Sequence, residues 1–466
     1  MRIDPKSIPG MKVTVMGLGI NGGGLASALF FARRGAEVTA TDLRGPAQLA
    51  ASLAELQGVP VRLVLERHEE GDFRTADLVV KNPAVSPASP YLQAARAHGA
   101  AVETDISIFL ALAANPILAV TGSKGKSTTA SAIAFGLARI DRGARLGGNI
   151  AVSPLSFLDG LSPRAPVVLE LSSWQLGDLR GRGLLAPAVS ALTVILPDHM
   201  DRYPGMTEYV ADKKVIFQEQ GPGTKAVFNL DDPWQRDFPR ETRAQSFFYS
   251  SAPLPAGRRG AWLAGDAGWA GADTDNELPR TLLGDVRIPG AHNRMNLLCA
   301  GLVLHLFGVR AEVVRTALAE FPGVEHRMEM FREWKGIRFY NDSAATIPHA
   351  TVQALRTLEP PLVLIAGGTD KNIDFSPLRE AVRKPDAIVL LAGTATEKIS
   401  AILKEEGVRG EGPFDSLAAA IEAALALARP GGAVLFSPGC ASFGMFLNEF
   451  DRGARFKRIV TEMTSA

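Results

Sequence analysis

Cysteine is scarce in this chain, and neither a targeting signal nor a membrane segment is evident. Cys299 and Cys440 are the only cysteines in 466 residues, so a disulfide framework is excluded and a reducing compartment is expected. The first residues lack the apolar segment of a signal peptide. The uncharged run 183–197 is shorter than the roughly 20 residues that span a bilayer, and it contains an internal proline. These features predict a soluble, cytoplasmic protein without membrane insertion.

The chain also lacks an excess of either charge. Its 50 basic and 49 acidic residues give a formal net charge of +1, so no overall field favours nucleic acid or an anionic membrane. With 466 residues, 46% of them hydrophobic, the chain is long enough for about three domains with cores of their own. We expect small-molecule substrates, no nucleic-acid partner and a monomeric state.

Short β-rich runs alternate with helical patterns along the chain. The expected strands are 13–16, 38–41, 78–80 (the third of the first domain), 117–120, 167–169, 191–195, 362–366, 387–391 and 433–436. This alternation predicts parallel, doubly wound sheets, and we divide the chain into three α/β domains at 1–104, 105–323 and 324–466. Residues 251–280 carry Trp262 and Trp269 at hairpin-like spacing, which predicts a short antiparallel segment.

The most informative stretch follows the apolar run 117–120. Its sequence is Thr121-Gly122-Ser123-Lys124-Gly125-Lys126-Ser127-Thr128, and a helical pattern comes next. Glycines let backbone N–H groups turn toward phosphate, the helix N-terminus adds partial positive charge, Lys126 neutralises phosphate oxygens and Ser127 offers a hydroxyl to Mg²⁺. Val120 stands where the general pattern has its first glycine. The stretch predicts a nucleoside-triphosphate site; the alternative is a chance turn that caps a helix.

A second glycine motif lies near the N-terminus. Gly17, Gly19 and Gly22 have the G-x-G-x-x-G spacing after a predicted strand, and Asp42 follows twenty positions after the last glycine. Alone, this motif would predict NAD bound to an acidic ribose ligand. Dehydrogenases have no use for the phosphate loop that follows, so a different nucleotide diphosphate fits as well. A tight strand-to-helix turn without a ligand is the third interpretation.

Several charged residues follow buried strands of the middle segment. Glu170 ends one strand, where a buried carboxylate is costly unless it is paired or binds a metal; the alternative is an exposed glutamate at a strand end. His199 lies within Asp198–Tyr203 and could bind a metal through its neutral imidazole, although a lone histidine is as often structural. Lys213 and Lys214 share a helical pattern; a solvated face is the default, and a lysine turned toward the metal would have a lowered pKa.

The last part of the chain offers further polar candidates. Asn293 and Asn296 share a helix face and could contact an adenine edge, or serve only as a cap. Arg327 and Lys371 would suit anionic oxygens. The run Asn341-Asp342-Ser343 places polar groups near the same predicted strand ends.

Together these stretches resemble the Mur ligases, ATP-dependent amide-forming enzymes of peptidoglycan precursor synthesis. The resemblance covers essentially the whole chain and is carried by motifs in a fixed order. They are Gly17-Leu18-Gly19, the phosphate loop, Gly147-Gly148-Asn149-Ile150, Glu170-Leu171-Ser172-Ser173, Asp198-His199-Met200-Asp201-Arg202-Tyr203, Gly290-x-His292-Asn293, His326-Arg327, Asn341-Asp342-Ser343 and Ser437-Pro438-x-Cys440-Ala441-Ser442.

The resemblance implies a fold and a reaction. The fold would be a Rossmann-like nucleotide domain, a central P-loop ATPase domain and a C-terminal Rossmann-like domain. The γ-phosphate of ATP would pass to the carboxylate of UDP-N-acetylmuramoyl-L-alanine, and the amine of glutamate would displace phosphate from the acyl phosphate. Positioning and charge neutralisation would supply the rate.

The resemblance also implies roles for individual residues. Catalytic roles fall to Lys126, His199 and Lys213, the last as a lysine carbamate made with CO₂. Two Mg²⁺ ions would be held by Ser127, Glu170, His199 and Lys213. ATP contacts would be Gly122, Ser123, Lys124, Gly125, Lys126, Ser127, Thr128, Asn293, Asn296, Arg327 and Asp342. The UDP-sugar would contact Gly19, Ile20, Asn21, Asp42, Leu43, Arg44, Asn149, Ser172 and Gln175, and the amino acid Thr346, Lys371, Ser442 and Phe443.

Three departures from the family pattern concern the last domain. Ala344 replaces a usual lysine, Gly444 replaces a usual aspartate, and Glu449 occupies the place of a usual aromatic, with Phe450 displaced by one. D-Glutamate is the expected amino acid, while L-glutamate or another amino acid stays open. A folylpolyglutamate synthase-like ligase shares the loop and the lysine, but should lack a Gly-x-Gly domain ahead of them. A catalytically silent nucleotide-binding protein is disfavoured, because Lys126, Ser127, Glu170, His199 and Lys213 occur together.

Overall fold

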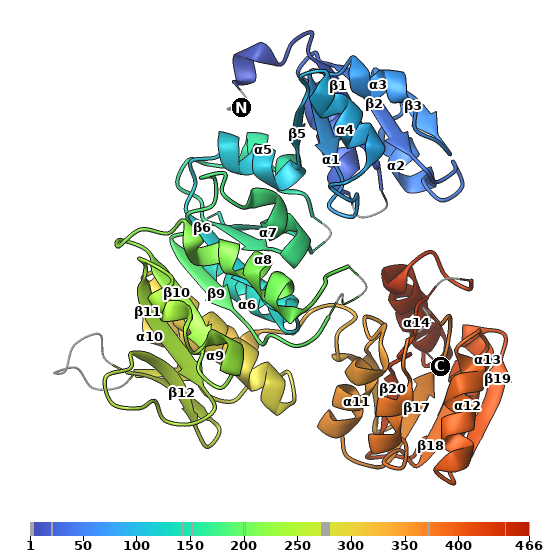
Figure 1. The fold of residues 1–466 in the computed structure, drawn as a ribbon. Helices are drawn as coiled ribbons and strands as arrows, with labels where there is room; N and C mark the ends of the chain where they lie inside the picture. The colour runs from blue at the N-terminus through green and yellow to red at the C-terminus, as the bar shows by residue number, and fades with distance from the viewer. Residues whose placement is uncertain are drawn as a thin grey trace. The chain divides into compact units, whose positions relative to one another are not determined.

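The structure is a computed structural model. It describes residues 4–19, 22–140, 143–150, 152–198, 200, 202–271, 280–370, 373–442 and 444–465. Across these residues the chain forms three β-sheets with surrounding helices (Figure 1). It divides into two compact units, Met1–Val286 with His292–Glu320, and Arg287–Ala291 with Phe321–Ala466. Of the described helices, none is long and apolar enough to cross a membrane.

The first sheet has five parallel strands in the order β3-β2-β1-β4-β5. Its strands are β1 (Lys12–Met16), β2 (Glu37–Asp42), β3 (Val61–Leu65), β4 (Leu78–Lys81) and β5 (Ala101–Glu103). The short helix η1 (Pro5–Ser7) precedes it, and α1 (Gly23–Ala32), α2 (Ala50–Glu55), α3 (Glu70–Arg74) and α4 (Pro90–Ala97) connect the strands. Successive side chains of β1 point to opposite faces, so Val13 and Val15 join one core and Met16 another.

The predicted strand at 78–80 is confirmed as a strand, but it is the fourth of this sheet and not the third. Strand β3 was not expected. It is an edge strand in which Arg62 and Leu63 are exposed, so its sequence shows neither a buried apolar run nor a clean alternation.

The second sheet has nine strands in the order β14-β13-β12-β11-β10-β9-β6-β8-β7. Its strands are β6 (Ile117–Thr121), β7 (Arg145–Gly148), β8 (Val167–Glu170), β9 (Val189–Leu192), β10 (Lys225–Asn229), β11 (Gln245–Ser250), β12 (Gly260–Ala264), β13 (Ala267–Ala270) and β14 (Arg280–Leu283). Its helices are α5 (Asp105–Leu112), α6 (Lys126–Ala138), α7 (Ser173–Leu179), α8 (Met206–Gln218), α9 (Ala291–Leu306) and α10 (Ala311–Glu320), with short helices η2 (Pro154–Ser156), η3 (Leu158–Gly160), η4 (Pro233–Gln235) and η5 (Phe238–Arg240).

The antiparallel segment is confirmed, because β12 and β13 pair antiparallel with Trp262 opposite Trp269. The strand expected at 191–195 is wrong at its C-terminal end, since β9 stops at Leu192. Val194 instead forms an isolated bridge with Lys124. The backbone after β9 therefore leaves the sheet to support the phosphate loop.

One hydrophobic core runs through both sheets of the first unit. It includes Val13 and Phe31 from the first sheet and its helix, Phe109 from α5, and Leu169 and Phe228 from the second sheet. These side chains are almost fully buried, and each contributes about 1.5–3 kcal/mol by leaving water. The first two domains therefore share a continuous apolar interior.

The third sheet has six strands in the order β15-β16-β20-β17-β18-β19 and is parallel except for β15 with β16. Its strands are β15 (Glu329–Trp334), β16 (Ile337–Asn341), β17 (Leu362–Ala366), β18 (Ala387–Leu391), β19 (Gly410–Phe414) and β20 (Ala433–Phe436). Helices α11 (Pro348–Thr357), α12 (Thr396–Glu405), α13 (Leu417–Leu427) and α14 (Glu449–Met463), with η6 (Ser376–Glu380), complete it. Leu364 and Ile365 face different cores, so both faces are covered, as the doubly wound prediction requires.

Candidate active site

The phosphate loop lies between β6 and α6, where two glycines adopt conformations that side chains rarely allow. Gly122 has a φ of 146° and Gly125 a φ of 87°. A Cβ atom on Gly122 would overlap the hydroxyl of Thr193, and one on Gly125 would overlap the amide of Asn296. Glycine is therefore required at both positions. Asn296 thus lies against the loop, and Ser127 and Thr128 occupy the first turn of α6.

The segment after β9 holds the loop in place. Thr193 Oγ1 donates to Lys124 O at 2.6 Å, and the Ser123 amide donates to Val194 O at 2.7 Å. Ser123 Oγ lies 2.8 Å from Leu196 O and 2.9 Å from Tyr209 Oη. Both the amide and the hydroxyl of Ser123 are therefore engaged by protein groups, so in this structure Ser123 shapes the loop.

The lysines of the loop differ in their surroundings. Lys126 Nζ donates to the Gly122 and Ser123 carbonyls at 3.0 and 3.1 Å, so it lies over the loop itself. Lys124 is half exposed and forms an ion pair of 3.3 Å with Asp198. Lys126 is thus the cation in position to meet phosphate bound by the loop.

Glu170 ends β8 beside the phosphate loop and is fully buried. Its Oε1 accepts from Asn149 Nδ2 at 3.0 Å, and the Asn149 amide donates to the Glu170 carbonyl at 2.8 Å. Among the described residues, nothing hydrogen-bonds the buried Oε2. A buried carboxylate oxygen without a partner is costly, and a cation would compensate this cost. Glu170 therefore fits the expected Mg²⁺ site.

Lys213 and Lys214, which the sequence could not distinguish, point in different directions from α8. Lys213 is 1% exposed and its Nζ donates to Gly122 O at 2.8 Å. Burial, with the nearby charge of Lys126, lowers the pKa of Lys213 well below its usual value. Lys214 forms an ion pair of 2.7 Å with Glu241 instead. The interpretation as a solvated face is therefore wrong for Lys213, while Lys214 is partly exposed and paired.

In the N-terminal glycine motif, a backbone amide donates a hydrogen bond to a buried carboxylate. Asp42 is buried, with Oδ2 accepting from the Gly19 amide and Oδ1 from the Arg44 amide, both at 2.9 Å. Leu43 between them is 68% exposed. The Asp42 carboxylate and the exposed apolar side chain of Leu43 suit a ribose and a base.

Asn82 is a residue of this loop that sequence reasoning missed. It follows β4, and a Cβ atom on Gly17 would lie 2.9 Å from Asn82 Cβ. Its Oδ1 accepts from the Ala84 amide at 3.0 Å. The Asn-Pro pair after a buried strand was visible in the sequence, but only the fold places it on the glycine loop.

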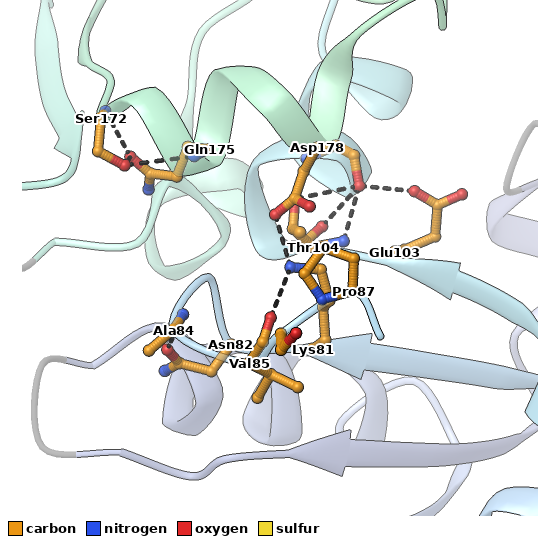
Figure 2. A network of polar contacts seen from close by, with 12 residues as sticks. Lys81, Asn82, Ala84, Val85, Pro87, Glu103, Thr104, Ser172, Gln175 and Asp178 are labelled. Atoms are coloured by element: carbon orange, nitrogen blue, oxygen red, sulfur yellow. Dashed lines mark hydrogen bonds and ion pairs between the residues drawn. The ribbon is translucent and has the colours of Figure 1, made fainter. Parts of the chain in front are cut away.

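Ser172 and Gln175 form a capping box at the start of α7 (Figure 2). The backbone amide of Gln175 donates to Ser172 Oγ at 3.2 Å, and the backbone amide of Ser172 donates to Gln175 Oε1 at 3.0 Å. Both side chains thus stabilise the helix start. Five expected site residues, Ile20, Asn21, His199, Lys371 and Phe443, lie outside the described residues.

In the second unit, Asp342 is buried at the end of β16. It accepts from Ser437 Oγ at 2.8 Å and from the Met328 amide at 3.1 Å. Burial raises the pKa of Asp342 to about 7, although Ser437 and the nearby Arg327 oppose the rise. Arg327 is exposed, whereas Asn293 in the first unit is buried.

Sequence reasoning did not identify Arg452, whose side chain connects two motifs of this unit. It is 1% exposed, and its guanidinium donates to Ser343 O at 2.7 Å, Ser343 Oγ at 3.0 Å and Cys440 O at 3.0 Å. It therefore joins the Asn341-Asp342-Ser343 motif to the Cys440-Ala441-Ser442 motif, with Ser442 buried and Thr346 partly buried. Nothing in the sequence of α14 distinguishes this arginine from a surface one.

The three departures also have places in this unit. Gly444 has a φ of 101°, which an aspartate would adopt only with strain. The Glu449 carbonyl accepts from Ser343 Oγ at 2.7 Å. Phe450 is 42% exposed, with its ring 6.0 Å from that of His326. The Ala344 amide donates to His326 O at 3.0 Å.

Three family models match successive parts of the chain. The Mur ligase MurD-like N-terminal domain matches residues 11–104, the Mur ligase middle domain 120–304, and the Mur ligase glutamate ligase domain 326–440. The chain therefore belongs to the Mur ligase family, and the expected three-domain α/β architecture is confirmed.

The chain is also similar to individual curated proteins and solved structures. The chain is 44% identical to the UDP-N-acetylmuramoylalanine--D-glutamate ligase of Roseiflexus sp. (strain RS-1), over 98% of this chain and 100% of the relative. It is 39% identical to the enzyme of the same name from Treponema pallidum (strain Nichols), over 98% and 99%. Among solved structures, UDP-N-acetylmuramate-alanine ligase MurC from Thermotoga maritima has a TM-score of 0.63 at 20% identity, covering 97% of this chain and 100% of that one. The latter likeness concerns the fold.

Proposed function

We propose that this protein is an ATP-dependent ligase that adds D-glutamate to UDP-N-acetylmuramoyl-L-alanine in peptidoglycan precursor synthesis. The observation that carries the proposal is the phosphate loop with Lys213 hydrogen-bonded to its Gly122 at 2.8 Å. The full-length identity of 44% to a ligase named for this reaction supports the substrate.

ATP would bind with its phosphates on the loop. Amides of the glycine turn and the N-terminus of α6 would hold phosphate oxygens, and Lys126 would neutralise the transferred group. Asn296, which lies against Gly125, and Asn293 would contact the nucleoside. Arg327 and Asp342 keep the ATP contacts that the family resemblance implies. Lys126 thus stabilises the charge that develops during transfer.

Magnesium would be held by Ser127 and Glu170, and a second ion by His199 and Lys213. When bound, the ions supply positive charge against the phosphate oxygens. The orphaned Oε2 of Glu170 supports the first assignment. Lys213 would accept CO₂ as a carbamate, because burial lowers the pKa of its ammonium and a neutral amine is the reactive form.

The domains would divide the substrates among them. Residues 1–104 would bind the UDP-sugar, 105–323 ATP, and 324–466 the amino acid. Gly19, Ile20, Asn21, Asp42, Leu43 and Arg44 would face the uridine, and Asn149, Ser172 and Gln175 the sugar side. Thr346, Lys371, Ser442 and Phe443 would hold the incoming glutamate.

In this proposal the protein acts as a monomer in the cytoplasm. Its two buried cysteines form no disulfide, which is compatible with a reducing environment. The decisive assay measures ADP formation with ATP, Mg²⁺ and UDP-N-acetylmuramoyl-L-alanine against D-glutamate, L-glutamate, lysine and diaminopimelate. D-Glutamate should give the largest kcat/KM. L-Glutamate as the better substrate would contradict the stereochemistry, and no ADP with any amino acid would refute the proposal.

A further inference from the structure

A buried ion pair connects the first sheet to the helix that follows β8. Lys81, the last residue of β4, is 5% exposed, and its Nζ lies 2.7 Å from Oδ2 of Asp178 in the last turn of α7. Nζ also lies 3.5 Å from the Val85 carbonyl (Figure 2). The pair thus bridges two of the three family domains inside one compact unit.

Each partner of this pair leads directly to one of the glycine loops. Lys81 is followed by Asn82, which packs on Gly17 of the nucleotide motif. Asp178 is preceded by Gly177, which packs closely on Asp212 of α8. A Cβ atom on Gly177 would lie 2.8 Å from Asp212 Oδ2. Asp212 precedes Lys213, whose Nζ bonds to Gly122 of the phosphate loop. A continuous series of contacts therefore runs from one loop to the other.

The charges around Asp178 make Lys81 its essential partner. Burial raises the pKa of Asp178, and Asp212 on α8 adds to the rise, while Lys81 and Arg182 oppose it. Arg182 already pairs with Glu103. A buried pair contributes little net stability compared with apolar side chains, but removing one partner leaves an unpaired charge. Such a pair fixes a geometry more than it stabilises a fold.

We propose that Lys81 and Asp178 are positioning residues that fix the UDP-sugar domain against helix α7, so that the substrate carboxylate meets the γ-phosphate on the phosphate loop. This inference rests on the proposed function. Neither residue needs to touch a substrate, since each acts through its neighbour, Asn82 or the α7–α8 contact. The alignment of two substrates is sensitive to small displacements, which cost up to about 10²-fold in rate.

The kinetic test compares Lys81→Met with wild type. We expect kcat/KM for UDP-N-acetylmuramoyl-L-alanine to fall about 10- to 100-fold, with the KM for ATP unchanged. Asp159→Asn is the matched control, because Asp159 is 70% exposed and pairs with Arg34, just after α1, across the same two domains. This control should retain wild-type kinetics.

The double variant Lys81→Met/Asp178→Asn tests whether the two residues act as a unit. It lacks the unpaired buried charge, so it should be no worse than either single variant, and it keeps the test valid if a single variant folds poorly. Additive losses in the double variant would overturn the pairing.

Hydrogen–deuterium exchange provides a readout independent of turnover. In Lys81→Met, exchange should increase in 78–85 and 173–179 and stay unchanged in α6. A wild-type enzyme that forms no ADP would refute the proposed function. An active wild type whose Lys81→Met variant keeps all kinetic constants, or loses ATP and UDP-sugar affinity equally, would overturn the positioning role alone.

Discussion

The two glycine loops of the first unit lead into helices that begin in the same way, but the charges beside the two loops are opposite. Each follows a parallel strand, and each leads into a helix whose N-cap is a left-handed glycine without a side-chain cap, Gly22 for α1 and Gly125 for α6. In the first loop the Asp42 carboxylate accepts the Gly19 amide. In the second, Lys126 and Lys213 both donate to the Gly122 carbonyl. In the proposed function, the carboxylate beside the first loop would suit a ribose, and the lysines beside the second would suit a triphosphate.

Removing the cation of the second loop should have the largest effect. In Lys126→Ala, phosphoryl transfer loses its principal protein charge, so we expect kcat to fall by about 10²–10³-fold or more. Phosphate release measures this loss. Calorimetry should show unchanged binding of UDP-N-acetylmuramoyl-L-alanine, and near-normal turnover would refute the loop assignment.

The second comparison concerns adjacent lysines of α8. Lys213→Arg keeps a positive charge but cannot form a carbamate, so kcat should fall about 10²-fold. Lys214→Arg is the control and should stay within about twofold, because Lys214 pairs at the surface. A ¹³C NMR carbamate signal after addition of labelled bicarbonate should appear in wild type and vanish only in Lys213→Arg. Full activity of that variant would remove Lys213 from the mechanism.

Removing the negative charge beside the first glycine loop should affect the UDP-sugar substrate and leave ATP unaffected. Asp42→Asn loses the charge that accepts the Gly19 and Arg44 amides, so the KM for UDP-N-acetylmuramoyl-L-alanine should rise about tenfold. The KM for ATP should not change. Steady-state kinetics with each substrate varied will decide, and a parallel increase in both constants would contradict separate sites.

The smallest effect concerns stability and pH. Folding raises the pKa of Asp342 from 3.8 to about 7, so the folded unit holds an extra proton between these values. Its stability should therefore fall as pH rises through this window. Calorimetry at pH 5 and pH 7.5 should show a smaller pH dependence of Tm in Asp342→Asn. An unchanged dependence would show that Asp342 does not titrate there.

Much of the fold could be predicted because its central strands are buried on both faces. Runs such as 117–120 and 433–436 are apolar throughout, and each is confirmed as a strand. Edge strand β3 has no such signature. Residues 193–195 look like a strand in sequence, yet Thr193 and Val194 hydrogen-bond to the phosphate loop and the Ile195 amide donates to Asp232, so tertiary contacts decide their conformation.

The candidate site was predictable where a motif fixes the backbone, as at Gly122 and Gly125. The site residues could not be predicted from the sequence where tertiary packing decides the direction of a side chain. Neighbouring helix positions differ in direction by about 100°, so sequence alone could not tell Lys213 from Lys214. The burial of Arg452 depends on tertiary contacts with two loops, at Ser343 far away along the chain and at Cys440 nearer to it.

The continuous apolar interior of the first unit has a consequence for dissecting the protein. A truncation near residue 104 would cut through one core, leaving side chains such as Phe31 and Leu169 without their partners. The second unit combines Arg287–Ala291 with Phe321–Ala466, so a break near Phe321 would remove the first of these segments from it, including Ile288, which lies against Gly323. Neither cut therefore leaves two intact units.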